Sequence, residues 1–196
     1  MHRKFFSAIG AAIALVISFS SLAQAQEILV MNEQRILRES AVGIHIASEL
    51  ERIGAEIQVE LTPLATRVQQ ENEALTAETA ALSEEAIRQR PDLMTRLQAL
   101  QTDAAEFEQR RQIAAAEIQA TERAAMQPVM AALANVLQEI VEERGALILI
   151  DRTQVVFAGE SIDISAAAIA RMNEVIPTTP VNRVRLPQGQ VPAAVE

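Results

Sequence analysis

The chain of 196 residues contains no cysteine, no tryptophan and no tyrosine. Without cysteine, neither a disulfide framework nor a thiolate metal site can form. Three of the five phenylalanines lie within the first 19 residues, so only Phe107 and Phe157 follow them. A globular enzyme of this length normally buries more aromatic side chains. Stability must therefore come from aliphatic packing or from assembly.

Positive charge and histidine are also scarce. The chain has 26 acidic and 17 basic residues, a formal net charge of -9, and its single lysine is Lys4. Such a surface repels phosphate backbones, so we expect no nucleic-acid binding. His45 is the one histidine beyond the N-terminal segment. Because no second ligand type accompanies it, we interpret it as a packed or surface imidazole rather than a metal ligand.

The sequence has no motif that is typical of an enzyme. No serine lies in a nucleophile-elbow context, and neither a P-loop nor a Rossmann fingerprint is present. Many carboxylates fall at solvent-facing helix positions, without a cleft around them. We therefore predict no catalytic residue, no cofactor and no metal site.

The N-terminus has the pattern of a secretory signal peptide. Arg3 and Lys4 precede an apolar run over residues 5–19, and Ala23-Gln24-Ala25 follows. We expect residues 1–25 to be removed, so that the mature chain begins at Gln26 outside the cytoplasm. A membrane anchor is the alternative, but the run is shorter than the ~20 residues that a spanning helix needs. No later stretch looks apolar enough to span a bilayer.

Residues 43–144 are rich in Ala, Glu, Gln, Leu and Arg, which are good helix formers. In the first half, residues recur every seven positions in two rows that would face a partner helix. One row is apolar, with Leu61, Val68, Leu75 and Leu82. The other begins with Leu64 and then becomes acidic, with Glu71, Glu78 and Glu85. In the second half, alternating spacings of four and three connect Leu93, Leu97, Leu100, Ala104, Phe107, Arg111, Ala114 and Ile118. Both patterns predict helices that pack side by side, as in coiled coils.

A break in the helical pattern lies at residues 88–92. Proline biases Arg90 away from helix, and Pro91 with Asp92 suits the first turn of a new helix. We interpret these residues as the tip of an antiparallel hairpin, whose arms of about 45 residues would each reach ~70 Å. The alternative is one continuous helix kinked at Pro91.

Two further prolines fall within the expected arms. Pro63 and Pro128 should each bend their helix, because each removes a backbone hydrogen bond and crowds the preceding turn. The alternative is that each proline ends one helix and begins another.

Short strands are expected on both sides of the arms. Residues 28–31 read as a first strand, and a brief helix completes a segment over residues 26–42. Gly145 should stop the second arm. Within residues 145–176, a β-hairpin with strands at 146–150 and 155–158 is followed by a closing helix that Ser165 caps.

These strands form only a small body, which is marginal alone and leaves strand edges open. We therefore predict an α+β, mostly helical fold, with a long antiparallel hairpin projecting from a small β body that homo-oligomerisation completes. Cyclic symmetry is the natural outcome. The proline-rich tail, residues 177–196, should be extended or disordered. The strand residues expected to join copies are Ile28, Val30, Leu147, Leu149, Val155 and Phe157.

The order of these parts resembles the OmpH/Skp family of periplasmic chaperones. The resemblance covers about residues 27–176 and is carried by EILVMNEQRILRES, the long hairpin, and GALILIDRTQVVFAGESIDIS before the last helix. It implies a jellyfish-like homotrimer in the periplasm, whose hairpins enclose a cavity for unfolded outer-membrane proteins. It also implies holding without ATP and contact with the outer-membrane assembly machinery. Outer-membrane strands alternate apolar and polar residues and would aggregate in water.

The acidic charge departs from the family, whose members are often strongly basic, and argues against carrying over lipid binding. Positive charge is nevertheless concentrated near the tip, where a basic patch could contact clients. The candidate client contacts are Arg88, Arg90, Met94 and Arg96. The alternative is that the arginines only pair with nearby acids, namely Glu84, Glu85 and Asp92.

A structural or adaptor coiled coil within an envelope or export complex is the competing function. It could use the same hairpin, but it would need one fixed partner and a continuous recognition stripe along the arms. A chaperone would instead bind many unfolded chains of one type.

Overall fold

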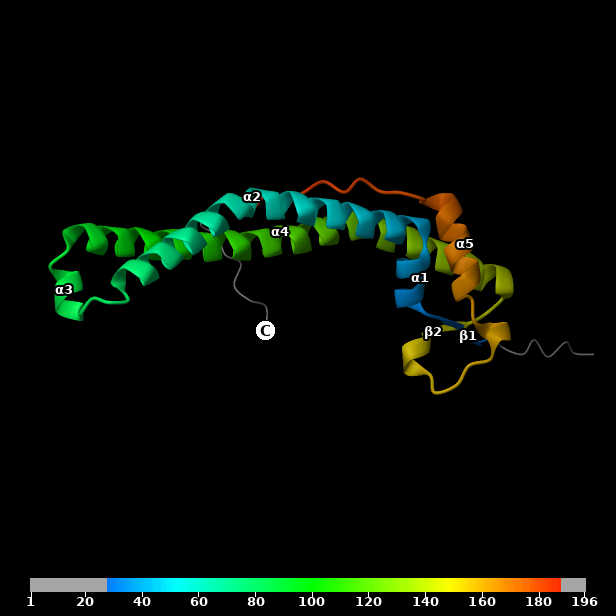
Figure 1. Cartoon of the computed structure of the whole chain (residues 1–196). Coiled ribbons are helices and arrows are strands. Elements are labelled where there is room, and N and C mark those ends of the chain that lie inside the picture. The colour runs from blue at the N-terminus through cyan, green and yellow to red at the C-terminus, as the bar shows by residue number, and fades with distance from the viewer. Residues whose placement is uncertain (1–27, 188–196) are drawn as a thin grey trace, which may run out of the picture.

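The computed structural model describes residues 28–187. The expected signal peptide, its cleavage site and residues 188–196 lie outside the described residues. A small body lies at one end, and two long helices extend from it side by side (Figure 1).

The elements follow one another as β1 (Ile28–Met31), α1 (Glu33–Glu39), α2 (Ala41–Thr79), α3 (Glu84–Arg88), α4 (Pro91–Arg144), β2 (Ile148–Asp151) and α5 (Ser165–Val175). Two short 3-10 helices, Arg152–Gln154 and Glu160–Ile162, lie between β2 and α5. The predicted mostly helical fold with a small sheet and long helices is confirmed.

A tight corner between α1 and α2 sets the direction of the first arm. Ser40 caps α2, and its Oγ accepts a hydrogen bond from the Gly43 backbone N–H at 3.3 Å. A Cβ on Gly43 would lie 1.6 Å from the carbonyl oxygen of Leu37. Only glycine therefore allows the two helices to approach so closely.

The arms form a hairpin, so the alternative of one helix kinked at Pro91 is wrong. The first arm, α2, ends at Thr79, earlier than expected, and α4 begins at Pro91. Ser83 starts the short helix α3 between them, because its Oγ accepts from the Ala86 N–H at 3.2 Å. The turn is therefore wider than residues 88–92, and Leu82 lies within it rather than in the arm seam.

Both arms run unbroken through their prolines. Pro63 lies inside the 39 residues of α2, and Pro128 lies inside the 54 residues of α4. The alternative in which these prolines separate successive helices is therefore wrong.

The hydrophobic core extends from the body to the middle of the arms. Its buried side chains from the first arm and the second arm are Val42, Ile46, Ile53, Ile57, Ala114, Ala125, Val129, Leu133, Val136 and Ile140. Leu29, Ile36, Ile164, Ala168 and Met172 complete it in the body. Within α4, no residue between Leu93 and Ile113 is buried. The half-polar seam thus leaves the distal arms loosely packed.

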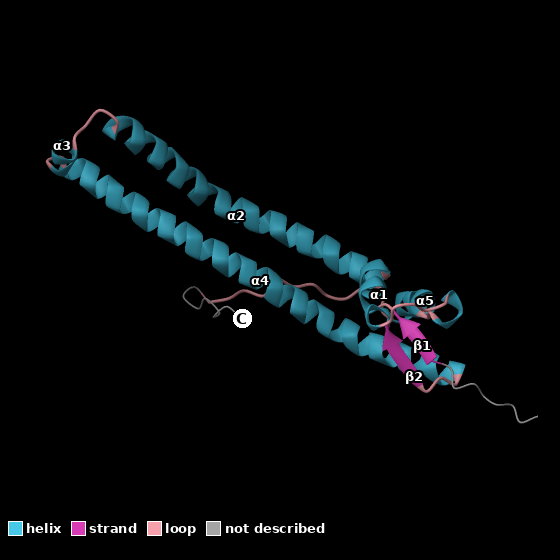
Figure 2. Ribbon diagram, turned by 90° about the horizontal axis from the view of Figure 1, so that it is seen from below, coloured by secondary structure: helices cyan, strands magenta, loops and turns pink. Residues whose placement is uncertain are grey.

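The sheet differs from the predicted β-hairpin. β1 pairs with β2 in parallel, with Ile28 opposite Ile148, so the two arms form the crossover between its strands (Figure 2). Residues 155–158 form no strand, which corrects the expectation for Val155 and Phe157. The Asp151 carboxylate accepts from the Thr153 N–H at 2.7 Å and starts a 3-10 turn that leads the chain away from β2.

The second side of β1 is covered by a single bridge rather than by a third strand. Val30 bridges Asp163, and its carbonyl accepts from the Ile164 N–H at 2.9 Å. Ser165 does not cap α5, because its Oγ accepts instead from the Asn32 N–H at 2.8 Å. Its hydroxyl therefore joins the closing helix to the end of β1.

The part of the tail that the structure describes is extended, which is one of the two expected states, and it contacts the arms. Residues 177–187, here called the strap, are extended and run back from α5 along both arms (Figure 1). Thr179 and Val181 are buried in this segment. Side-chain and backbone contacts with the arms hold the strap in place, although its composition is proline-rich.

By its length and mean hydropathy, α4 contains one 18-residue stretch that could span a membrane. This corrects the expectation that no stretch after the N-terminal segment is apolar enough to do so. The side of α4 that carries Val129, Leu133 and Val136 is buried against the rest of the chain. Packing within the chain thus buries 28% of that stretch.

Two glycines allow a matched test of how glycine affects stability at the end of a helix, Gly145, and inside a helix, Gly54. Gly145 ends α4 with φ +64°, whereas Gly54 lies inside α2 with open space where a Cβ would lie. We expect Gly145→Ala to lower the free energy of unfolding by about 1 kcal/mol and Gly54→Ala to raise it by up to about 1 kcal/mol. Urea unfolding followed by circular dichroism at fixed protein concentration measures both. A shift of the same sign in both variants would contradict this assignment.

Candidate functional site

The edge of the body exposes a group of apolar side chains. Leu147 and Phe157 are 68% and 85% exposed, and Ile28 is also exposed. Sequence reasoning missed Ile148 and Val156, which are exposed on the same segment. Contiguous exposed apolar groups of this kind are typical of interaction sites. In the described chain, the outer side of β2 pairs with no strand.

Three of the predicted joining residues are less accessible. Val30 is buried in the core of its own chain, which leaves it no surface to offer a second copy. Leu149 and Val155 are half-buried. The exposed set, here called the body edge, consists of Ile28, Leu147, Ile148, Val156 and Phe157.

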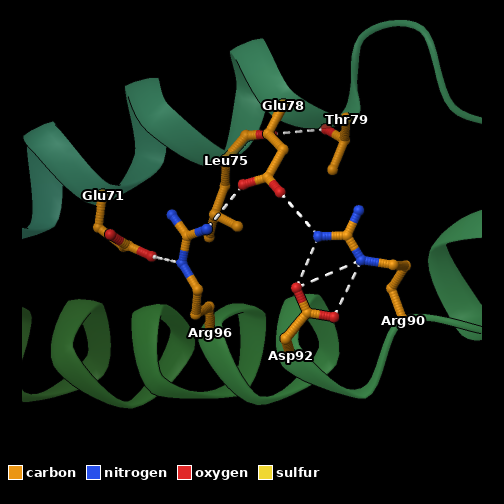
Figure 3. A network of polar contacts seen from close by, with 7 residues as sticks. All are labelled: Glu71, Leu75, Glu78, Thr79, Arg90, Asp92 and Arg96. Atoms are coloured by element: carbon orange, nitrogen blue, oxygen red, sulfur yellow. Dashed lines mark hydrogen bonds and ion pairs between the residues drawn. The ribbon is translucent and has the colours of Figure 1, made fainter.

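A network of ion pairs joins the arms near their tip (Figure 3). The guanidinium of Arg96 on α4 donates to Glu71 and Glu78 on α2, at 2.7 Å in each case. Glu78 also accepts from Arg90 Nη2 at 3.0 Å, and Arg90 donates to Asp92 at 2.6 Å. The acidic seam of the first arm thus faces the arginines of the second.

The tip arginines are therefore largely paired. Arg88 contacts Glu84 at 2.9 Å, and Glu85 accepts from Gln89 rather than from an arginine. This arrangement favours pairing over a free basic patch. Met94 is exposed, and its contact with a client stays a prediction.

These pairs shift the proton affinities at the tip. The hydrogen bond from Arg90 lowers the pKa of Asp92 from 3.8 to about 2. Hydrogen bonds to Glu71 and Glu78 raise the pKa of Arg96 above its ordinary value. Asp92 and Arg96 therefore both keep their charges across the physiological pH range.

A third surface lies at the middle of the arms, where the strap is docked. Here Glu60 comes from α2 and Glu117 from α4, and both contact Arg183 of the strap. The apolar floor is formed by Ile57, Leu61, Ile113 and Ala114. The hollow here is also lined by Arg183, Arg185 and Leu186 of the strap. We call the surface that the arms contribute the mid-arm groove, with the lining residues Ile57, Glu60, Leu61, Arg110, Ile113, Ala114 and Glu117.

Glu117 is a buried carboxylate whose partners come from the strap. Its Oε2 accepts from Arg183 Nε at 2.8 Å, and its Oε1 accepts from the Leu186 N–H at 3.0 Å. The side chain of Arg183 is also largely buried. The hydrogen bond from Arg183 to Glu60 holds the pKa of the Glu60 carboxyl below its usual value.

Further contacts fix both halves of the strap. His45 Nε2 lies 3.0 Å from the carbonyl oxygen of Thr179, consistent with the expected packed imidazole. The Val184 N–H donates to Thr121 Oγ1 at 2.9 Å. The sequence signals that could have found this surface are the acidic residue Glu117 beside the α4 seam and the alternating run VNRVRL.

No arrangement of ionisable side chains between residues 28 and 187 suggests a metal centre. In that range, no group of three or more His, Cys, Asp or Glu side chains could hold a metal ion. Ion pairing between the arms and strap instead accounts for the clustered acids described above.

Comparison with known proteins relates this architecture to one family. A family model described as outer membrane protein (OmpH-like) matches residues 27–172. A crystal structure from Caulobacter crescentus, described as a candidate outer membrane chaperone (OmpH-like), is 27% identical, with a TM-score of 0.66. The similarity covers 82% of this chain and 92% of that chain. Among curated proteins, no chain matches.

The titration of Asp92 tests the tip network. Because its pKa is lowered, the pairing stabilises the folded chain above the unfolded pKa near 3.8, and this stabilisation is lost as pH falls toward about 2. We expect Arg90→Ala to return the Asp92 pKa toward 3.8, measured by NMR of the carboxyl carbon.

The matched control is Arg88→Ala, since Arg88 pairs with Glu84 instead. It should leave the titration of Asp92 unchanged. An Asp92 pKa that is ordinary before any substitution would show that the ion pair with Arg90 does not form in solution.

Proposed function

Because this chain belongs to the OmpH-like outer membrane protein family, we propose that it is a periplasmic chaperone that holds unfolded outer-membrane proteins until their insertion. It acts by binding rather than by catalysis, and it requires neither ATP nor another cofactor. The mature protein reaches the periplasm after removal of the N-terminal signal peptide.

The observation that carries this proposal is the body edge. Leu147, directly before β2, and Phe157, in the loop after it, expose most of their surface, and in the described chain the outer side of β2 pairs with no strand. A small body with such an edge is expected to join other copies, because association buries apolar area and satisfies strand groups. We propose a homotrimer whose bodies meet there and whose arms surround a shared space.

The arms suit a holding role because their distal halves are loosely packed. Leu97, Leu100 and Phe107 are only half-buried in one chain, so apolar area remains available along α4. Outer-membrane strands alternate apolar and polar residues, and such chains can be held by many weak contacts that break singly. Release then needs no nucleotide.

Suppression of aggregation tests this function. A urea-unfolded outer-membrane porin is diluted into buffer with or without the processed protein, and light scattering is recorded. We expect scattering to be largely suppressed at one trimer per porin and unchanged for a natively folded porin. Scattering that rises as fast as in buffer alone would contradict holding and would favour the adaptor function.

The contact between copies has its own test. Val156→Asp places a charge in the body edge, whereas Val59→Asp places the same charge on an exposed position of α2. We expect the first variant to shift the sedimentation coefficient toward that of a single chain and the second to leave it unchanged, because burying an unpaired carboxylate is unfavourable. Equal sedimentation of the two variants would place the contact elsewhere.

A further inference from the structure

The strap reads as a peptide bound to the arms rather than as part of the body. It has no helix or strand, and its contacts reach both α2 and α4. Along it, Thr179 and Val181 are buried while Pro180 and Asn182 are exposed. This two-residue period is that of an extended chain lying on a surface.

The strap supplies the hydrogen-bond donors for the acid of the mid-arm groove. Both carboxylate oxygens of Glu117 find their hydrogen-bond donors in Arg183 and Leu186. A buried carboxylate without partners is strongly unfavourable. In the docked state, both oxygens of this buried carboxylate are therefore satisfied by the strap, and the same acceptor positions are open to the donors of another extended segment once the strap leaves.

Recognition in the groove combines charge with an extended backbone. Arg183 donates to Glu60 on one arm at 2.9 Å and to Glu117 on the other at 2.8 Å. Backbone N–H groups of Val184 and Leu186 donate to Thr121 and Glu117. Backbone bonds of this kind do not depend on the identity of the bound side chains, whereas the paired acids select a cationic residue.

We propose that the mid-arm groove binds extended segments in which apolar residues alternate with arginine, and that the strap is its resting occupant, displaced by such a segment of an unfolded outer-membrane protein. This inference rests on the proposed function and names one surface that would carry it. Strands of outer-membrane proteins have the same two-residue alternation as the strap.

Displacement requires breaking the hydrogen bonds of Arg183, Val184 and Leu186 and exposing Thr179 and Val181, but the strap forms no helix or strand that would have to unfold. It competes as an intramolecular ligand, so an incoming segment must overcome the effective concentration that tethering gives. A long client that engages the distal arms as well gains the same advantage. The strap would therefore exclude short peptides and yield to long unfolded chains.

A labelled peptide with the sequence of residues 177–190, PTTPVNRVRLPQGQ, tests the groove in the full processed protein. Arg183→Glu should release the strap, because the new carboxylate faces Glu60 and Glu117. In the unchanged protein the strap occupies the groove, so the apparent affinity for the peptide is reduced to the fraction of molecules whose groove is free. We therefore expect the variant to bind the peptide at least about tenfold more tightly than the unchanged protein.

Two controls define the specificity of that result. Asn182→Glu places the same charge on an exposed position of the strap and should bind the peptide like the unchanged protein. A peptide carrying glutamate at the position of Arg183 should not bind the released groove. Circular dichroism and sedimentation of both variants identify any that misfold.

Amide hydrogen exchange in the unchanged protein provides a second measurement that needs no variant. Adding an unfolded outer-membrane porin should accelerate exchange at Val184 and Leu186 by at least about tenfold, because their acceptors are taken by the client. Failure of the Arg183→Glu variant to bind the peptide, or exchange that the porin leaves unchanged, would overturn the proposal. If aggregation is suppressed in either case, the chaperone function stands without this groove; if aggregation is not suppressed, the function itself fails.

Discussion

The parallel pairing of β1 with β2 is the constraint on which the rest of the structure depends. These strands are separated by both arms, so the pairing closes the hairpin at its base and fixes where the arms begin. Parallel strands need a long crossover, and here the crossover includes both arms. The pairing uses only one side of β2. Leu147 and Ile148 at the start of this strand are exposed, and so is Phe157 in the loop that follows it.

The sequence predicted those features that local residues determine. The helical composition and Pro91 placed the hairpin, and Gly145 ended the second arm with the left-handed conformation expected of a helix stop. The β-hairpin was wrong because residues 146–158 look suitable for two adjacent strands. Their apolar pattern does not say which strand is the partner, and β2 pairs with β1 from the other end of the chain.

The candidate sites were less predictable because they depend on contacts between distant residues. The sequence shows that arginines are concentrated near the tip, but their pairing with Glu71 and Glu78 follows from the antiparallel packing of the arms. The strap was missed for a similar reason. Composition described a proline-rich tail, whereas its position depends on contacts with distant arm residues, among them the buried acid Glu117, 66 residues before Arg183.

A body that is completed only between copies should lose its fold when the copies separate. Sedimentation equilibrium and helix content measured together over a series of dilutions test this claim most directly. We expect a mass of three chains at high concentration and a loss of helical signal that coincides with dissociation. A single chain that keeps its full helical signal at the lowest concentration would contradict the account.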